Sequence, residues 1–151
     1  MTVDYTPATS GGAAMGFGAI GLAANGVAIF DNEAAPGDSI YDEIVSFDDC
    51  EGHPANTTCH YHAEPTSITQ SNSSASSFVG VLKDGIPVYG RTLETSSPTL
   101  DSEGGQTYST EDSSVSLYHY HVHYQTDGGS NSAYFITSGT YKGPEGTCSG
   151  C

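Results

Sequence analysis

Two stretches, IGLAANGVAIF at residues 20–30 and VGVLKDGIPVY at residues 79–89, decide the fold of this 151-residue chain. Each stretch places two apolar runs around a turn dipeptide, Asn25-Gly26 in the first and Asp84-Gly85 in the second. Such dipeptides between apolar runs are a strong short-range signal for a β-hairpin. The stretches align at an offset of 59 residues, with nine of eleven positions identical or alike. The sequence therefore predicts two copies of one hairpin.

The same offset of 59 residues places His60-Tyr61-His62 on His119-Tyr120-His121. The general similarity of small hairpins does not explain a second motif at the same offset, so we predict an internal duplication. The expected fold is mainly β, with two hairpin-and-histidine-strand halves, about residues 18–62 and 77–121, forming one compact β-domain. This domain is expected to span residues 15–151, which suits the usual length of a single domain.

One short helix is expected between the two halves of the duplication. The segment SIYDEIVSF at residues 39–47 places Ile40, Ile44 and Phe47 at helical spacing behind Asp38 or Ser39 as an N-cap. Residues 1–14 are expected to form an N-terminal arm followed by a glycine-rich hinge at 10–14.

The composition excludes several classes of protein. The formal net charge is −15, and Lys and Arg together number only three, so no basic surface is available for nucleic acid. No apolar run approaches 18 residues, so we expect no membrane span. The first ten residues lack the basic and apolar regions of a signal peptide, and an exported chain would therefore be a mature or partial one. Four cysteines and serine-rich loops favour an extracellular or cell-surface location.

The histidines are the candidate metal ligands. Side chains two residues apart in a strand share a face, so His60 and His62 point one way, and His119 and His121 do likewise. If a pseudo-twofold arrangement brings the two strands side by side, four imidazoles converge, with His53 close in sequence. Neutral imidazole suits zinc or copper. The alternative is that these side chains are half-buried aromatics satisfied by hydrogen bonds.

Calcium is the second metal that we consider, because carboxylates recur in the loops and hard cations take oxygen ligands. No twelve-residue calcium loop is present, so most of these side chains are expected to form a solvated face. The carboxylates concerned are Asp31, Glu33, Asp38, Asp42, Glu43, Asp48, Asp49, Asp101 and Glu103.

Three motifs together resemble the YHYH domain family of mostly secreted proteins: FDDCEGHPANTTCHYHAEP (47–65), VGVLKDGIPVYG (79–90) and LYHYHVHY (117–124). The family's Cys-x-Gly-His element corresponds to Cys50, Gly52 and His53. Its Tyr-His-Tyr-His strand is preserved at 118–121 and altered to Cys-His-Tyr-His at 59–62. The biochemical role of the family is largely undefined, so the resemblance implies a fold more than a function.

The cysteines are expected to form two local disulfides. Cys59 in place of the family's first tyrosine suggests a bridge to Cys50. Cys148 and Cys151 form a CxxC, but no residues follow that would depress a thiol pKa, so a structural disulfide is favoured over a redox role. Pairing of Cys50 and Cys59 with the tail is the alternative.

Two sequons, at Asn56 and Asn72, are candidate glycosylation sites if the source organism modifies its exported proteins.

No established catalytic signature is present, which makes an enzyme less favoured than a building block. We expect an extracellular structural protein that self-assembles into a filament or surface layer and carries a histidine-rich metal site. The arm at residues 2–6 would add as a strand to a neighbouring copy, so the expected partner is the protein itself, with glycans as a further partner. The alternatives are an extracellular metal-sequestering protein and a copper- or zinc-dependent enzyme.

Overall fold

The protein is mainly β, as the sequence predicts. A computed structural model describes residues 6–49, 51–55, 58–69, 77–91, 99–110 and 112–147. The strands are β1 (Ala19–Ala23), β2 (Ala28–Phe30), β3 (Gly52–Ala55), β4 (Thr58–Tyr61), β5 (Phe78–Leu82), β6 (Pro87–Tyr89), β7 (Gly105–Thr110), β8 (Ser113–His121), β9 (His123–Thr126) and β10 (Ser132–Phe135). The helical segments are α1 (Ile40–Glu43), the 3₁₀ turn η1 (Ile44–Ser46) and α2 (Thr66–Thr69).

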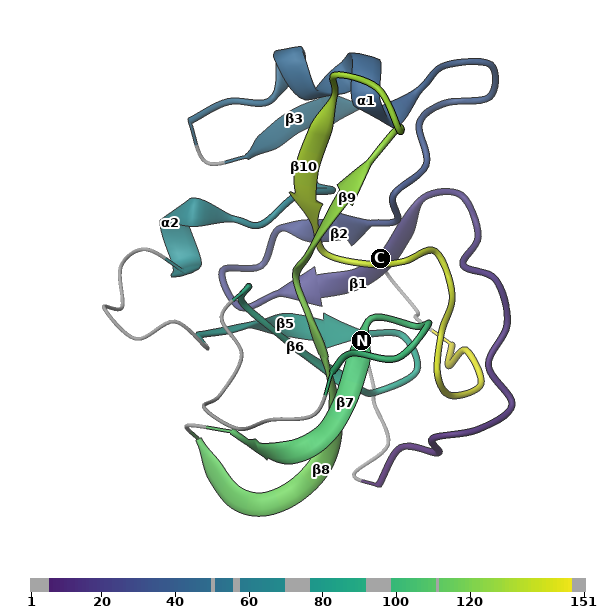
Figure 1. Ribbon diagram of the computed structural model, residues 1–151, viewed down its shortest axis with the longest axis vertical. Helices are drawn as coiled ribbons and strands as arrows, with labels where there is room; N and C mark the ends of the chain where they lie inside the picture. The colour runs from purple at the N-terminus through teal and green to yellow at the C-terminus, as the bar shows by residue number, and fades with distance from the viewer. Residues whose placement is uncertain are drawn as a thin grey trace.

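Eight of these strands form one sheet in the order β3-β4-β2-β1-β5-β6-β8-β7, and β9 pairs with β10 in a small second sheet. The order is symmetric, because four strands of the first half mirror four strands of the second about the β1–β5 pair. Figure 1 shows this sheet along the long axis of the molecule, with β3 at the top and β7 and β8 at the bottom.

The two halves have the same strand register. Ala19 pairs with Phe30 in the first hairpin, and the residues 59 positions later, Phe78 and Tyr89, pair in the second. Both hairpins shift register directly after this pair. The parallel pairs β2–β4 and β6–β8 also correspond, through Ile29 with Tyr61 and Val88 with Tyr120. The duplication seen in the sequence is therefore a duplication of backbone structure.

The β1–β5 pair marks the symmetry axis between the halves. Leu22 and Val81 are equivalent residues, 59 positions apart, and they pair with each other. Their equivalent neighbours Gly21 and Gly80 lie where the two backbones approach most closely. A Cβ on Gly80 would lie 2.4 Å from the Leu22 carbonyl oxygen, so only glycine fits there.

The hairpin turns form as their sequences predict. Gly26 and Gly85 have positive φ angles of 86° and 84°, which glycine adopts without steric cost. The side chains before them hold the turns, since Asn25 Oδ1 accepts a hydrogen bond from the Val27 amide and Asp84 Oδ1 accepts one from the Ile86 amide.

The core is built largely from equivalent residues of the two halves. The alternation within the histidine strands is confirmed, because Tyr61 and Tyr120 point into this core while the histidines point to the other face. The equivalent core pairs are Ile20 with Val79, Ala23 with Leu82, Val27 with Ile86, Ile29 with Val88 and Tyr61 with Tyr120. Met15, Ile136 and Tyr141 from outside the duplicated units complete it.

The expected helix forms at the predicted place. Ser39 caps α1, with its Oγ accepting a hydrogen bond from the Tyr41 amide, and the chain continues as η1 to Ser46. The single turn α2 is an additional helix that the sequence pattern did not indicate. Within the described residues, no helix is long and apolar enough to cross a membrane.

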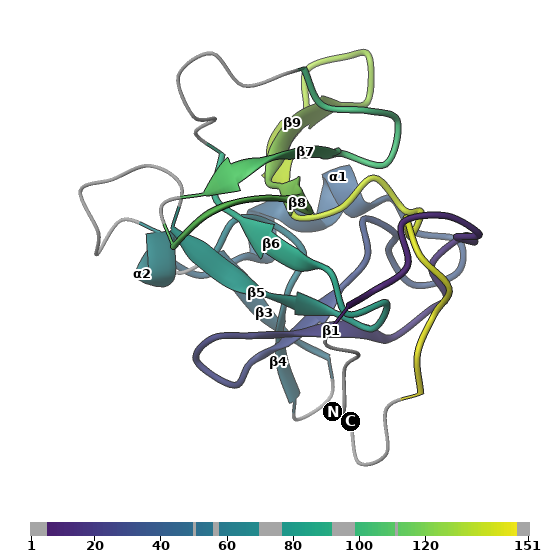
Figure 2. The ribbon, with the colours of Figure 1, turned by 90° about the horizontal axis from the view of Figure 1, so that it is seen from below.

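The glycine-rich segment expected to act as a hinge packs against the chain near residue 140. The Tyr141 amide donates to the Ala13 carbonyl and the Met15 amide donates to the Gly139 carbonyl, both at 2.9 Å. Gly12 permits this contact, because a Cβ there would lie 1.8 Å from the Tyr141 carbonyl oxygen. Figure 2 shows the two segments, purple and yellow, running side by side. Residues 1–5 of the arm lie outside the described residues.

Candidate metal centre

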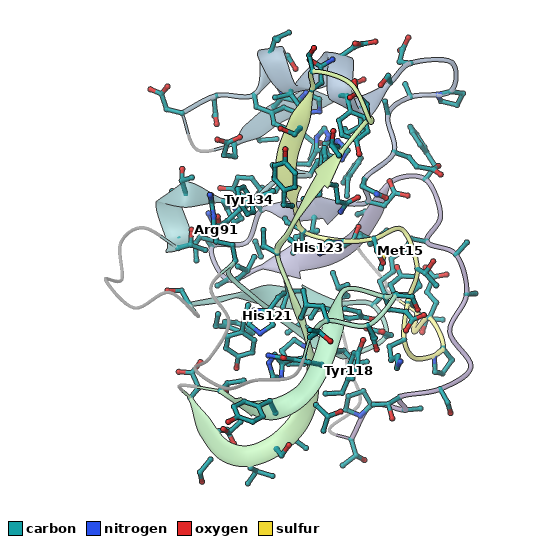
Figure 3. All side chains as sticks on the ribbon, viewed as in Figure 1. Met15, Arg91, Tyr118, His121, His123 and Tyr134 are labelled. Carbon is teal, nitrogen blue, oxygen red and sulfur yellow. The ribbon has the colours of Figure 1, made fainter. Side chains whose placement is uncertain are left out.

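The two histidine strands do not lie side by side, so the expectation of one four-histidine site is wrong. Four strands separate β4 from β8 in the sheet, which is about 24 Å at the usual strand spacing. The symmetry axis passes through β1 and β5 instead of through the histidine strands, and this carries the two pairs to opposite ends. Figure 3 shows His121 in the lower half of the molecule, beside β8.

The first half brings His53, His60 and His62 together. The β3–β4 register pairs His53 with His60, and His62 follows directly after β4 on the same face. The Nε2 atoms of His53 and His60 are 2.9 Å apart, and those of His60 and His62 are also 2.9 Å apart. Two imidazoles on one tetrahedral zinc ion have their nitrogens about 3.3 Å apart. The spacing is thus close to that of a metal centre.

Hydrogen bonds at the opposite ring nitrogens assign the tautomers of these three histidines. His62 Nδ1 contacts the Asp31 carbonyl oxygen, and His60 Nδ1 lies 3.5 Å from the Thr58 carbonyl oxygen. Because a carbonyl only accepts, each Nδ1 carries the ring proton, and each Nε2 is left with a lone pair.

His53 follows the same logic through Ser46. The Ser46 hydroxyl donates to the Glu43 carbonyl, so its oxygen accepts from His53 Nδ1 at 2.9 Å. All three Nε2 lone pairs therefore face one point. This is how outer hydrogen bonds orient metal-ligating histidines in proteins.

Aromatic and acidic side chains surround the three imidazoles. Phe30 stacks on His60 with ring centroids 4.0 Å apart, and Phe47 lies parallel to the His62 ring at 6.0 Å. One side opens into a pocket of about 230 Å³, whose lining includes Glu33 and Glu43. The Glu43 carboxylate lies 3.7 Å from His53 Nε2. The pocket thus offers space and an anionic group beside the three nitrogens.

Burial keeps the central imidazoles neutral. Desolvation lowers the pKa of His62 from 6.5 to about 4, and the pKa of His60 is lowered for the same reason. Both rings lose their charge well below neutral pH, so protons compete weakly for Nε2. Nearby, desolvation raises the pKa of the buried Asp31 carboxyl to about 6.

The second half contains a reduced version of this arrangement. His119 and His121 have their Nε2 atoms 3.1 Å apart, while Gln106 occupies the place of His53 in the strand register. The Gln106 side-chain nitrogen lies 3.2 Å from His121 Nε2. The sequence comparison missed this equivalence, because β3 and β7 match at an offset of 53 residues instead of 59.

A shared turn could have revealed the equivalence of β3 and β7. Asp48 Oδ1 accepts from the Gly52 amide at 3.0 Å, and Asp101 Oδ1 accepts from the Gly105 amide at 3.1 Å. The Asp-x-x-x-Gly spacing, DDCEG at 48–52 and DSEGG at 101–105, is the signal in the sequence.

The model of the YHYH protein family matches residues 1–110, which include His53, His60 and His62. The chain belongs to the YHYH protein family. The match confirms the resemblance noted in the sequence, although it ends before β8. Neither the comparison with curated proteins nor the comparison with solved structures finds a match.

The other predicted sites of this YHYH protein are not tested by its structure. Cys59 has a free, exposed thiol, while Cys50, Cys148 and Cys151 lie outside the described residues. Asn56 and Asn72 lie outside them as well. Both disulfides and both glycosylation sites therefore stay predictions.

Several of the acidic residues considered for calcium have other partners. Asp101 and Glu103 each bind Lys142, at 2.7 and 2.9 Å. Among the described residues, the one group of three or more potential ligands placed for a shared metal is His53, His60 and His62.

Buried charge elsewhere serves packing. Glu64, 3% exposed, accepts hydrogen bonds from the backbone and side chain of Arg91, whose guanidinium lies 3.9 Å from the Tyr134 ring centroid. Figure 3 shows Arg91 and Tyr134 together beside β10. This contact ties the small sheet to the end of β6.

Proposed function

We propose that this YHYH protein binds a divalent transition-metal ion, zinc or copper, through His53, His60 and His62, and that it acts outside the cell as a metal-binding protein. The observation that carries the proposal is the convergence of three Nε2 lone pairs at 2.9 Å spacings. Three imidazoles with an open fourth position form a common donor set for zinc and copper.

A proton does not replace the metal in this arrangement. For His60 and His62 to hydrogen-bond directly, one ring would have to carry a second proton at Nε2, because each Nδ1 proton is directed at a carbonyl. Burial lowers the pKa of both rings, which opposes that protonation near neutral pH. Two lone pairs facing each other are repulsive, and a cation between them removes the repulsion.

The pocket supports a divalent ion at this site. Glu33 and Glu43 line it and supply negative charge where the fourth ligand position opens. A water molecule or the Glu43 carboxylate has room to complete the coordination. The formal charge of −15 adds a long-range attraction for cations.

The test is metal binding by the chelator-treated protein, measured by calorimetry and elemental analysis. We expect one zinc or copper(II) per chain and a raised melting temperature. His53→Gln should weaken zinc binding by about 100-fold, because it removes one of three ligands. His123→Gln is the matched control, since His123 lies outside the site, and it should bind zinc as the original protein does.

Failure of the chelator-treated protein to take up zinc or copper at micromolar concentration would overturn the proposal. Equal zinc affinity in His53→Gln and His123→Gln would do the same, because it would place the metal elsewhere.

Self-assembly is a second proposal, supported by the sheet itself. β3 and β7 end the eight-stranded sheet, and neither has a second strand partner among the described residues. Such edges offer unpaired backbone groups to a strand from another copy. The packing of residues 12–15 limits the arm available for exchange to the residues before them.

A further inference from the structure

The histidine pair of the second half repeats the hydrogen bonding of the first. His119 Nδ1 lies 3.0 Å from the Leu117 carbonyl oxygen, and His121 Nδ1 lies 2.7 Å from the Gly90 carbonyl oxygen. These carbonyls belong to residues 59 positions after Thr58 and Asp31, which hold His60 and His62. By the same argument, both Nδ1 atoms carry the ring proton and both Nε2 lone pairs face each other at 3.1 Å.

The surroundings of this pair differ from those of the first site. His119 and His121 are 1% and 0% exposed, and Gln106 is 3% exposed. Tyr89 takes the place of Phe30, with its ring 5.3 Å from His119. Within the part of the chain that the structure describes, no third histidine, thiol or carboxylate joins the pair to form a ligand group. The donor set is therefore neutral and enclosed.

We propose that His119 and His121 form a second, separate metal site, which takes a monovalent ion of the copper(I) type and has Gln106 as a third, weak ligand. Copper(I) accepts two or three ligands, whereas zinc and copper(II) usually take four or more. A single positive charge is also less costly than a double charge in a buried site without an anionic ligand. Rotation of the Gln106 amide would turn its oxygen towards the ion.

The duplication thus yields two sites that differ in one residue of the ligand triangle. The first half has His53 and an acidic pocket, and it suits a divalent ion. The second half has Gln106 in the equivalent position, and it suits a monovalent ion. One chain would then hold both kinds of ion at opposite ends of its sheet.

The test uses silver(I), a stable stand-in for copper(I), on the full chain with its free thiols blocked by iodoacetamide. Zinc-loaded protein labelled with nitrogen-15 at histidine is titrated with silver nitrate in chloride-free buffer. We expect native mass spectrometry to show one added silver ion. NMR should show shifts of the His119 and His121 Nε2 resonances, while those of His53, His60 and His62 stay unchanged.

Two variants convert one site into the other. Gln106→His should raise the zinc stoichiometry from one to two per chain, because it recreates three imidazoles. His53→Gln should lose tight zinc binding and keep silver binding in both halves, because both donor sets then match. The silver result at His119 and His121 does not depend on zinc binding, so failure of the proposed function and failure of this inference are distinguishable.

The inference is overturned if zinc-loaded, thiol-blocked protein takes up no further silver ion. It is also overturned if the silver ion shifts other histidines and leaves His119 and His121 unchanged. Uptake of a second zinc ion by the original protein at these two residues would show a divalent site instead.

Discussion

At the scale of single residues, the hydrogen bond at Nδ1 decides what each histidine offers at Nε2. Backbone carbonyls of Asp31 and Gly90 occupy equivalent places in the two halves and fix the rings of His62 and His121. The sequence identifies the histidines, but it does not identify these carbonyls, because they lie 31 residues away along the chain. The tautomers are thus a product of the tertiary fold.

The lowered pKa of His62 predicts an acid sensitivity of the metal-free protein. The folded pKa of about 4 lies below the unfolded value of 6.5, so the unfolded state binds the proton first. Stability should therefore fall as the pH drops through this window. Between pH 7 and 4.5, the loss attributable to His62 is about 2 kcal/mol.

Urea unfolding in the presence of chelator measures this effect, with His62→Gln as the reference. The original protein should lose about 2 kcal/mol more than the variant over that pH range. The Asp31 carboxyl, whose pKa is raised to about 6, acts in the opposite direction, but it is present in both proteins and cancels. Parallel pH profiles for the two proteins would contradict the prediction.

Glu51 predicts a stabilising substitution. It is the one non-glycine residue with positive φ in the described part of the chain, at 65°, and the equivalent turn of the second half has Gly104 at 81°. Left-handed backbone costs a residue with a Cβ about 1 to 2 kcal/mol, which exceeds the extra entropy cost of glycine. Glu51→Gly should raise the unfolding free energy by roughly 0.5 kcal/mol.

Asp49→Gly is the matched control, since Asp49 lies in the same turn without positive φ. It should lower the unfolding free energy by a similar amount. A loss of stability in both variants would show that the Glu51 side chain contributes more than its backbone strain costs.

At the scale of elements, local patterns predicted the hairpins and the helix, while pairing over long distances was beyond them. Asn25-Gly26 and Asp84-Gly85 mark turns that form within a few residues, and Ser39 caps a helix directly beside it. The order of strands depends on which edges meet, and no short motif encodes it. The repeat predicted a symmetry axis but not its position, which is why the four-histidine site was expected.

The crossing of β1 and β5 predicts a strict need for glycine at residue 80. A Cβ at this position would lie 2.4 Å from the Leu22 carbonyl oxygen and 2.8 Å from the Ala23 Cα, and both belong to backbone. Gly80→Ala would therefore force the two halves apart. We expect a loss of about 3 kcal/mol in unfolding free energy.

Gly16→Ala is the control, because a Cβ there meets nothing within 4 Å. Its thermal unfolding should match that of the original protein or show slightly higher stability. If Gly80→Ala unfolds at the same temperature as Gly16→Ala, the close approach of β1 and β5 is not essential.

At the scale of the whole molecule, charge and the open sheet edges act against each other. Each copy carries a formal charge of −15, so copies repel one another at low salt. The outer edges of β3 and β7 favour pairing with a strand from another copy. Assembly therefore requires that salt screen the charge or that divalent ions bridge it.

The arm supplies a specific test of self-assembly. Residues from Gly12 onward pack against the chain at 139–141, so a truncation that spares them leaves the fold intact. Deleting residues 1–5 removes Val3 and Tyr5, the side chains expected to fill pockets on a neighbouring copy. In sedimentation at high protein concentration with calcium, the full chain should form large species and the truncated chain should stay monomeric. Low salt with chelator should dissociate the assemblies, because repulsion is then unscreened. A full chain that stays monomeric with calcium present would show that the arm does not drive association, and metal binding at the histidines would then stand as the function by itself.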